Sequence, residues 1–166
     1  MSARLLRRPL RRVPRRWRPA TLLATWFGIG LLPWVPGTWA SLVALPLAWL
    51  LVGLGGSWAL GAGLVAVFAV GWWASGVYER EAGVHDPSAV VIDEVAAQWL
   101  TLMLIPADPW LYAAGFVLFR VADIAKLWPA NILDRRLTGG LGIMLDDMIA
   151  AVYAAAALFL IAQGVA

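Results

Sequence analysis

Residues 87–105, PSAVVIDEVAAQWLTLMLI, decide the fold class, because this stretch is nearly all apolar and yet carries two adjacent carboxylates. A helix of this length would measure about 28 Å, which is close to the thickness of the hydrocarbon core of a bilayer. Asp86 and Pro87 fit an N-cap followed by proline at the first helical position. The sequence therefore predicts a transmembrane helix over residues 87–105 that contains Asp93 and Glu94.

The chain as a whole has the composition of a membrane protein. Of its 166 residues, 62% are hydrophobic and 14% are charged, and the mean hydropathy is +0.78. Soluble domains are about 25% charged, so this chain has too few charges to cover a water-exposed surface of its size. The same composition excludes a disordered or collagen-like chain. We expect a single membrane-embedded domain over residues 19–166.

Further apolar segments complete the expected bundle. Four of them are candidate spans: residues 40–54, 57–74, 110–126 and 146–162. The first two predict a hairpin that turns at Gly55-Gly56, whereas residues 21–32 are too short to span and suit an interfacial or re-entrant helix. Five tryptophans lie near the expected helix ends, as in an aromatic belt: Trp34, Trp39, Trp99, Trp110 and Trp128. The predicted fold is an all-α, multi-span transmembrane helical bundle with an interfacial or re-entrant N-terminal helix, of four or five spans.

Basic residues are concentrated at the N-terminus. Residues 1–18 hold eight arginines: Arg4, Arg7, Arg8, Arg11, Arg12, Arg15, Arg16 and Arg18. Beside apolar segments, such a tail fits the positive-inside rule and attraction to anionic lipids better than binding of nucleic acid. It lacks the single apolar stretch and cleavage site of a signal peptide. We expect a retained, cytoplasmic and disordered tail.

The acidic residues gather at one membrane face. Tracing the spans from a cytoplasmic N-terminus places nine of the ten acidic residues at the inner face, all but Asp108. Seven ionisable groups fall within predicted helices or at their inner ends: Asp93, Glu94, Arg120, Asp123, Lys126, Asp146 and Asp147. Ionisable groups in membrane helices are costly and by default indicate function. Carboxylates that meet in a small bundle need cations, and the structural alternative is a set of salt bridges between helices.

The available side chains favour a hard cation and phosphate. With no cysteine and one histidine, the chain excludes thiolate metal sites, Cys-phosphate intermediates and two-histidine phosphatases. Carboxylates favour Mg²⁺ or Mn²⁺ over zinc or copper. Arg120 and Lys126 offer partners for phosphate oxygens, and the glycines of residues 139–142 can bring backbone N–H groups close to an anion. Asp146 and Asp147 are expected to open the last helix, where its dipole favours anions. These features predict phosphoryl chemistry at the membrane surface.

Four segments resemble those of the phosphatidylglycerophosphatase A family, which are Mg²⁺-dependent bacterial membrane lipid phosphatases. They are PGT with SL (residues 36–38 and 41–42), VHD with VIDEV (84–86 and 91–95), FRxxDIxKxWP (119–129) and LDRxxxGGLGIMLDD (133–147). They follow the family's order. The chain departs from the family pattern at Ala40, Ala97, Ala151, Leu127 and Ala130. None of these departures removes a carboxylate or a cation.

The resemblance implies a multi-pass phosphatase of the bacterial inner membrane that converts phosphatidylglycerophosphate to phosphatidylglycerol and phosphate at the cytoplasmic face. We hypothesise that Mg²⁺, as one or two ions, is held by the acidic residues Asp93, Glu94, Asp123, Asp146 and Asp147. Glu94 is either a ligand or the general base for the attacking water. Arg120 and Lys126 are expected to stabilise the equatorial phosphate oxygens. The expected partners are the phospholipid substrate and anionic lipids at the tail, and a homo-oligomer is left open.

Four further residues have two interpretations each. Thr38 either hydrogen-bonds the phosphate or caps a helix, and Asp86 either orients a ligand or caps its helix. His85 is either a proton donor to the leaving alkoxide or a surface residue, and Asp134 is either catalytic or paired with a neighbouring arginine. Two other functions also stay open. One is a phosphatase for another lipid phosphomonoester, and the other is an ion-coupled transporter.

Overall fold

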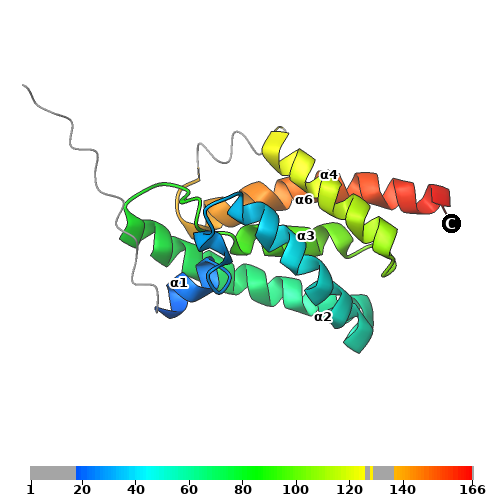
Figure 1. Ribbon diagram of the computed structural model, residues 1–166, viewed down its shortest axis with the longest axis horizontal. Helices are drawn as coiled ribbons and strands as arrows, with labels where there is room; N and C mark the ends of the chain where they lie inside the picture. The colour runs from blue at the N-terminus through cyan, green and yellow to red at the C-terminus, as the bar shows by residue number, and fades with distance from the viewer. Residues whose placement is uncertain (1–17, 126–127, 129–136, 166) are drawn as a thin grey trace, which may run out of the picture.

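The computed structural model describes residues 18–125, 128 and 137–165, and every regular element within them is helical (Figure 1). In chain order the elements are α1 (Pro19–Ala24), the 3-10 helix η1 (Ile29–Leu31), α2 (Pro36–Ala82), α3 (Ile92–Leu102), α4 (Pro109–Ala125) and α6 (Gly140–Val165). The all-α prediction is confirmed for these residues. Among them, α2 and α6 are long and apolar enough to cross a membrane.

α2 consists of two helical arms joined at a glycine pair, as predicted. Gly55 has φ −157° and Gly56 has φ 66° with ψ −162°, so the helical path breaks there. The second arm folds back beside the first (Figure 1), and a methyl group at Gly63 would lie 3.0 Å from Leu51 Cδ1. Both arms extend beyond the predicted spans, since the first begins at Pro36 and the second ends at Ala82.

The prediction of a helix over residues 87–105 is wrong at its N-terminal side. α3 has 11 residues and a length of about 16 Å, and it begins at Ile92 after the N-cap residue Val91. The chain before it turns, with Val90 N–H donating to the Pro87 carbonyl, and Val91 N–H donates to the Ala24 carbonyl. This long-range bond fixes Val91 outside the helix. Asp86 is therefore not a cap of α3.

The last helix begins earlier than predicted. α6 starts at Gly140 rather than at Asp146, and Gly140 packs closely against Gly76 of α2, so that the two backbones approach each other. Asp147 consequently lies in the second turn of α6 instead of at its N-terminus. The expected dipole effect on Asp146 and Asp147 is therefore not the reason for their position.

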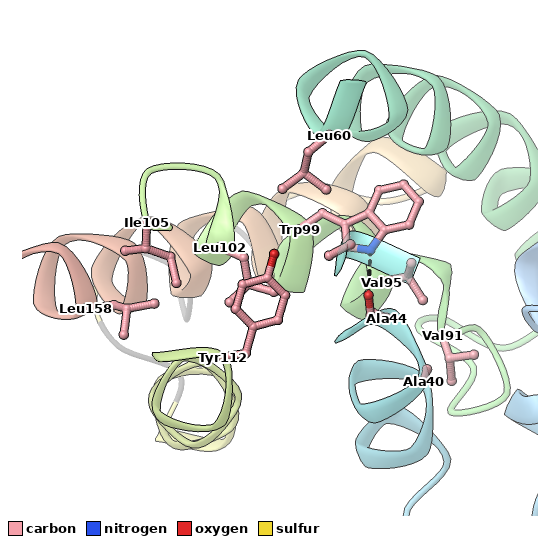
Figure 2. Packing of buried hydrophobic residues seen from close by; sticks show 11 residues of the cluster. Ala40, Ala44, Leu60, Val91, Val95, Trp99, Leu102, Ile105, Tyr112 and Leu158 are labelled. Atoms are coloured by element: carbon pink, nitrogen blue, oxygen red, sulfur yellow. Dashed lines mark hydrogen bonds between the residues drawn. The ribbon is translucent and has the colours of Figure 1, made fainter. Parts of the chain in front are cut away.

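The core joins α2, α3, α4 and α6 (Figure 2). Trp99 is 5% exposed, and its indole N–H donates to the Ala44 carbonyl at 2.9 Å. Trp99 is thus a packing residue, which corrects its assignment to an aromatic belt. By contrast, Trp34, Trp110 and Trp128 are 78%, 83% and 69% exposed.

The N-terminal segment enters the bundle and leaves it at the same end. Arg18 forms an ion pair with Glu81 near the end of α2. After six residues of α1, the Trp26 ring meets the Trp99 ring edge-on with centroids 6.4 Å apart. The chain then returns, so that Gly30 lies directly against the Ala89 carbonyl. At about 9 Å, α1 is too short to cross a membrane.

Candidate functional site

A polar cavity of about 240 Å³ lies where α2 begins, α3 begins and α4 ends. Six carboxylate residues line it: Asp86, Asp93, Glu94, Asp123, Asp146 and Asp147. Arg120 is the one arginine or lysine among its described lining residues. The cavity therefore holds an excess of negative charge, which favours a bound cation.

Three of these carboxylates meet closely. One oxygen each of Asp93, Glu94 and Asp147 can be chosen so that all three lie within 4.8 Å of one another. Asp93 and Asp147 are 6% and 7% exposed. Glu94 Oε2 and Asp147 Oδ2 are buried, and no described residue donates a hydrogen bond to either oxygen. Buried and mutually repelling oxygens of this kind fit the ligand set of a hard divalent cation.

The position of the first two carboxylates follows from the start of α3. Both lie in its first turn, where the helix dipole favours anions. Asp93 Oδ1 also accepts a hydrogen bond from the Glu94 backbone N–H at 3.1 Å. The loop before α3 therefore places Asp93 and Glu94 at a helix N-terminus, which the longer predicted helix would not have done.

Arg120 connects the cluster to α4. Its Nη1 lies 2.8 Å from Asp123 Oδ2, one turn along the helix, and 3.8 Å from Glu94 Oε1. Both side chains of the Arg120–Asp123 pair are 16% exposed. Asp123 thus orients the guanidinium toward the cavity, where Arg120 can bind oxygens of an anionic group.

Gly37 allows the first turn of α2 to approach this site. A Cβ at residue 37 would overlap Glu94 Oε1 and would lie 3.3 Å from Arg120 Nη1. Gly37 is therefore a site residue that the analysis of charges missed. The signal was present in the PGT motif, whose glycine leaves room for a carboxylate, although nothing in the sequence identifies that carboxylate as Glu94.

The other predicted site residues occupy three kinds of position. Asp86 and His85 line the cavity, and His85 Nδ1 lies 2.7 Å from Glu79 Oε1. Thr38 is half-buried and is not among the described lining residues, which include its neighbour Gly37. Lys126 and Asp134 fall outside the described residues. Of the glycines at residues 139–142, Gly142 lines the cavity and Gly140 packs against α2.

The chain is similar to known proteins over most of its length. The model of the family described as phosphatidylglycerophosphatase A matches residues 22–162, a range that contains every described carboxylate of the cavity. The chain belongs to the phosphatidylglycerophosphatase A family. It is 42% identical over 145 residues to phosphatidylglycerophosphatase A of Escherichia coli strain K12, covering 86% of this chain and 83% of that protein.

Two further proteins are similar to most of the chain. The chain is 38% identical over 149 residues to phosphatidylglycerophosphatase A of Haemophilus influenzae, covering 86% of this chain and 88% of that one. It is also 36% identical over 139 residues to a Bacteroides thetaiotaomicron protein named "Putative phosphatidylinositol-3-phosphatase", covering 80% and 86%. No solved structure matches the chain.

Proposed function

We propose that this protein is a lipid phosphatase of phosphatidylglycerol synthesis, which hydrolyses phosphatidylglycerophosphate to phosphatidylglycerol and phosphate. The observation that carries the proposal is the acidic cavity beside Arg120, in a chain that belongs to this family over most of its length. The substrate's terminal phosphomonoester carries more negative charge than the phosphodiester of the product. A site built from a cation and an arginine can therefore bind substrate in preference to product.

We propose that the cofactor is Mg²⁺ and that Asp93, Glu94 and Asp147 hold it. Mg²⁺ is usually bound through one or two carboxylates, with water and substrate phosphate completing its shell. When bound, it would polarise the phosphoryl group and lower the pKa of water. Asp123 and Asp146 line the same cavity and are proposed as further ligands or as holders of ordered water.

The protein's own side chains would position the phosphoryl group. Arg120 is held against Asp123 and donates to the equatorial oxygens, whose charge grows in the transition state. Glu94 has one oxygen near Arg120 and one oxygen without a described hydrogen-bond donor. If Asp123 or Asp146 replaces it as a ligand, Glu94 is instead the group that accepts a proton from the attacking water. Lys126 keeps its proposed role as a second phosphate-binding cation.

His85 and Asp86 are proposed as secondary residues at the cavity wall. His85 is paired with Glu79 and could donate a proton to the leaving alkoxide, whereas Asp86 would orient a bound ligand. The proposals that Thr38 binds phosphate and that Asp134 takes part in catalysis have no described contact to support them.

We further propose a multi-pass arrangement in the bacterial inner membrane, in which residues 19–166 form one phosphatase domain with its cavity at the cytoplasmic face. From Asp147, α6 continues to Val165 over about 27 Å, close to the hydrocarbon thickness of a bilayer. This length supports a cavity at the level of the headgroups. The N-terminal segment would then be re-entrant, and the arginine tail would attract anionic lipids on the same side.

A second candidate function is hydrolysis of another lipid phosphomonoester. The Bacteroides thetaiotaomicron relative is 36% identical to this chain, and its name refers to a different lipid headgroup, phosphatidylinositol 3-phosphate. The transporter alternative has less support. Asp108, its outermost acidic group, caps α4 by accepting from the N–H groups of Trp110 and Leu111.

The test is phosphate release by the purified full-length protein in mixed micelles. We expect release from phosphatidylglycerophosphate with Mg²⁺, loss of release in EDTA, and recovery when Mg²⁺ is restored. Phosphatidic acid and phosphatidylinositol 3-phosphate, supplied at equal concentrations, should give lower kcat/KM. A higher value for either would favour the second candidate, and undiminished release in EDTA would exclude the metal.

A further inference from the structure

A second hollow lies directly beside the acidic cavity. This groove has a volume of about 340 Å³, within the range of sites that bind small ligands. It runs between residues 30–33, the end of α2 at Tyr78 and Ala82, and the loop that leads to α3. Pro36 and Ser88 line both the groove and the acidic cavity. The two hollows are therefore adjacent parts of one surface.

The two hollows differ in chemistry. None of the described residues that line the groove is charged, whereas six carboxylates line the cavity. A ligand that occupies both is therefore expected to be charged at one end and uncharged at the other. A phospholipid with a terminal phosphomonoester has this distribution of charge.

The outer wall of the groove continues into an exposed apolar surface. Leu31 and Leu32 line the groove and are 37% and 43% exposed, and the following Trp34 and Val35 are 78% and 64% exposed. Adjacent exposed apolar side chains mark surfaces for lipid or ligand. Val35 also lines the cavity and has φ 39°, a costly conformation for a β-branched residue that surrounding packing must hold.

We infer that the groove receives the glycerol-ester end of the lipid and the first carbons of its acyl chains, while the phosphomonoester occupies the acidic cavity. The acyl chains would continue along the exposed surface of residues 31–35 into the bilayer. This assignment rests on the proposed function, since it takes the substrate to be a lipid. It identifies the N-terminal segment as part of the substrate site.

The direct test is photolabelling of the full-length protein in phosphatidylethanolamine vesicles. The probe is phosphatidylglycerophosphate with a diazirine beside the ester carbonyl of one acyl chain. The matched control is phosphatidylcholine with the same diazirine. We expect the first probe to label residues 30–33 or 87–89 several-fold more than the control, which can reach only the exposed sides of Leu31 and Leu32. Equal labelling by both probes, labelling confined to other faces, or crosslinks from this groove to a second copy of the chain would overturn the inference.

The kinetic test uses substitutions that place a large side chain in the groove. Ala82→Phe and Ala89→Phe should lower kcat/KM about tenfold more for a dioleoyl substrate than for its deacylated analogue, which keeps the terminal phosphomonoester but lacks the esters and acyl carbons; tenfold corresponds to lost contacts of about two methylenes. Ala156→Phe, the same change at an exposed position of α6, should alter neither value. An equal effect on both substrates, or none, would contradict the inference. Absence of phosphate release by the unaltered protein would instead count against the proposed function, and the photolabelling would still test the groove.

Discussion

At the scale of single residues, the site depends on a close approach that leaves no room for a side chain. Glu94 Oε1 lies where a Cβ of residue 37 would be, and Arg120 lies just beyond it. The first turn of α2 therefore lies directly against Glu94 on the side next to Arg120. Small shifts of a reacting group cost large factors in rate.

Gly37→Ala should therefore lower kcat on phosphatidylglycerophosphate by roughly 100-fold, because Glu94 must move away from its present position. Gly53→Ala is the matched control on the same arm of α2, where an added Cβ has no neighbour within 4 Å among the described residues. The control should keep normal turnover. Normal turnover in Gly37→Ala would show that the position of Glu94 is not required.

Asp147 should control how the protein responds to Mg²⁺. A cation that binds only the folded state raises stability by about 2.7 kcal/mol at 100 times its Kd, so Mg²⁺ should raise the unfolding temperature of the protein in detergent. Asp147→Asn removes one of the three clustered charges and should abolish most of that increase. Asp108→Asn, the same change at the cap of α4, should retain it. An identical Mg²⁺ response in Asp147→Asn would rule out the proposed ligand set.

At the scale of elements, the hairpin of α2 depends on one backbone conformation. Gly56 has φ 66° and ψ −162°, a region that is open almost only to glycine. The second arm can fold back onto the first only if the chain adopts this conformation. The arms then supply both the first turn beside Glu94 and the surface on which α6 packs.

Gly56→Ala should consequently lower the free energy of unfolding by about 1–3 kcal/mol, measured by thermal or denaturant unfolding in detergent. Gly53→Ala, three residues earlier in regular helix, should raise it by roughly 0.5–1 kcal/mol, because alanine has the higher helix propensity. If both variants had the same stability, the bend would not require glycine.

Local sequence signals predicted the elements better than their ends. The bend at Gly55-Gly56 can be predicted from two adjacent residues, and each helical segment can be predicted from its own apolar composition. At the start of α3, Val91 instead donates a hydrogen bond to Ala24, and at the start of α6, Gly140 contacts Gly76. These partners are distant in the sequence, so local composition cannot reveal them.

For the candidate site, too, the sequence indicated the charged residues but not the contacts between distant segments. The charges alone indicated Asp93, Glu94, Asp123 and Asp147, because ionisable groups are rare in apolar helices. The pairing of Arg120 with Asp123 follows from helical spacing. The approach of Gly37 to Glu94 required the tertiary structure.

At the scale of the whole molecule, the two ends of the bundle differ. The acidic cavity and the groove lie together at one end, whereas the turn of α2 meets the turn between α3 and α4 at the other, where Ser57 and Trp58 border a hollow with Met103 and Pro106. A membrane enzyme with this asymmetry should expose its chemistry on one side only. The absence of cysteine makes that proposal easy to test.

Thr138→Cys and Ala107→Cys place single thiols at exposed positions of opposite ends. With a maleimide that cannot cross membranes, Thr138→Cys should react in inside-out vesicles and Ala107→Cys in right-side-out cells. Mass spectrometry measures the extent of each reaction. The reverse pattern would place the cavity on the outer side of the membrane, and labelling of both from one side would contradict the spanning arrangement.

The carboxylate cluster combines residues of α3 and α6, which are far apart in the sequence, and this has a consequence for biosynthesis. Asp147 follows Asp93 and Glu94 in the sequence and lies on the last helix of the described residues, so it is the last of the three clustered carboxylates to be synthesised. Under the proposed ligand set, a nascent polypeptide that lacks α6 would therefore be unable to hold the ion and could not yet hydrolyse lipids in the bilayer that receives it.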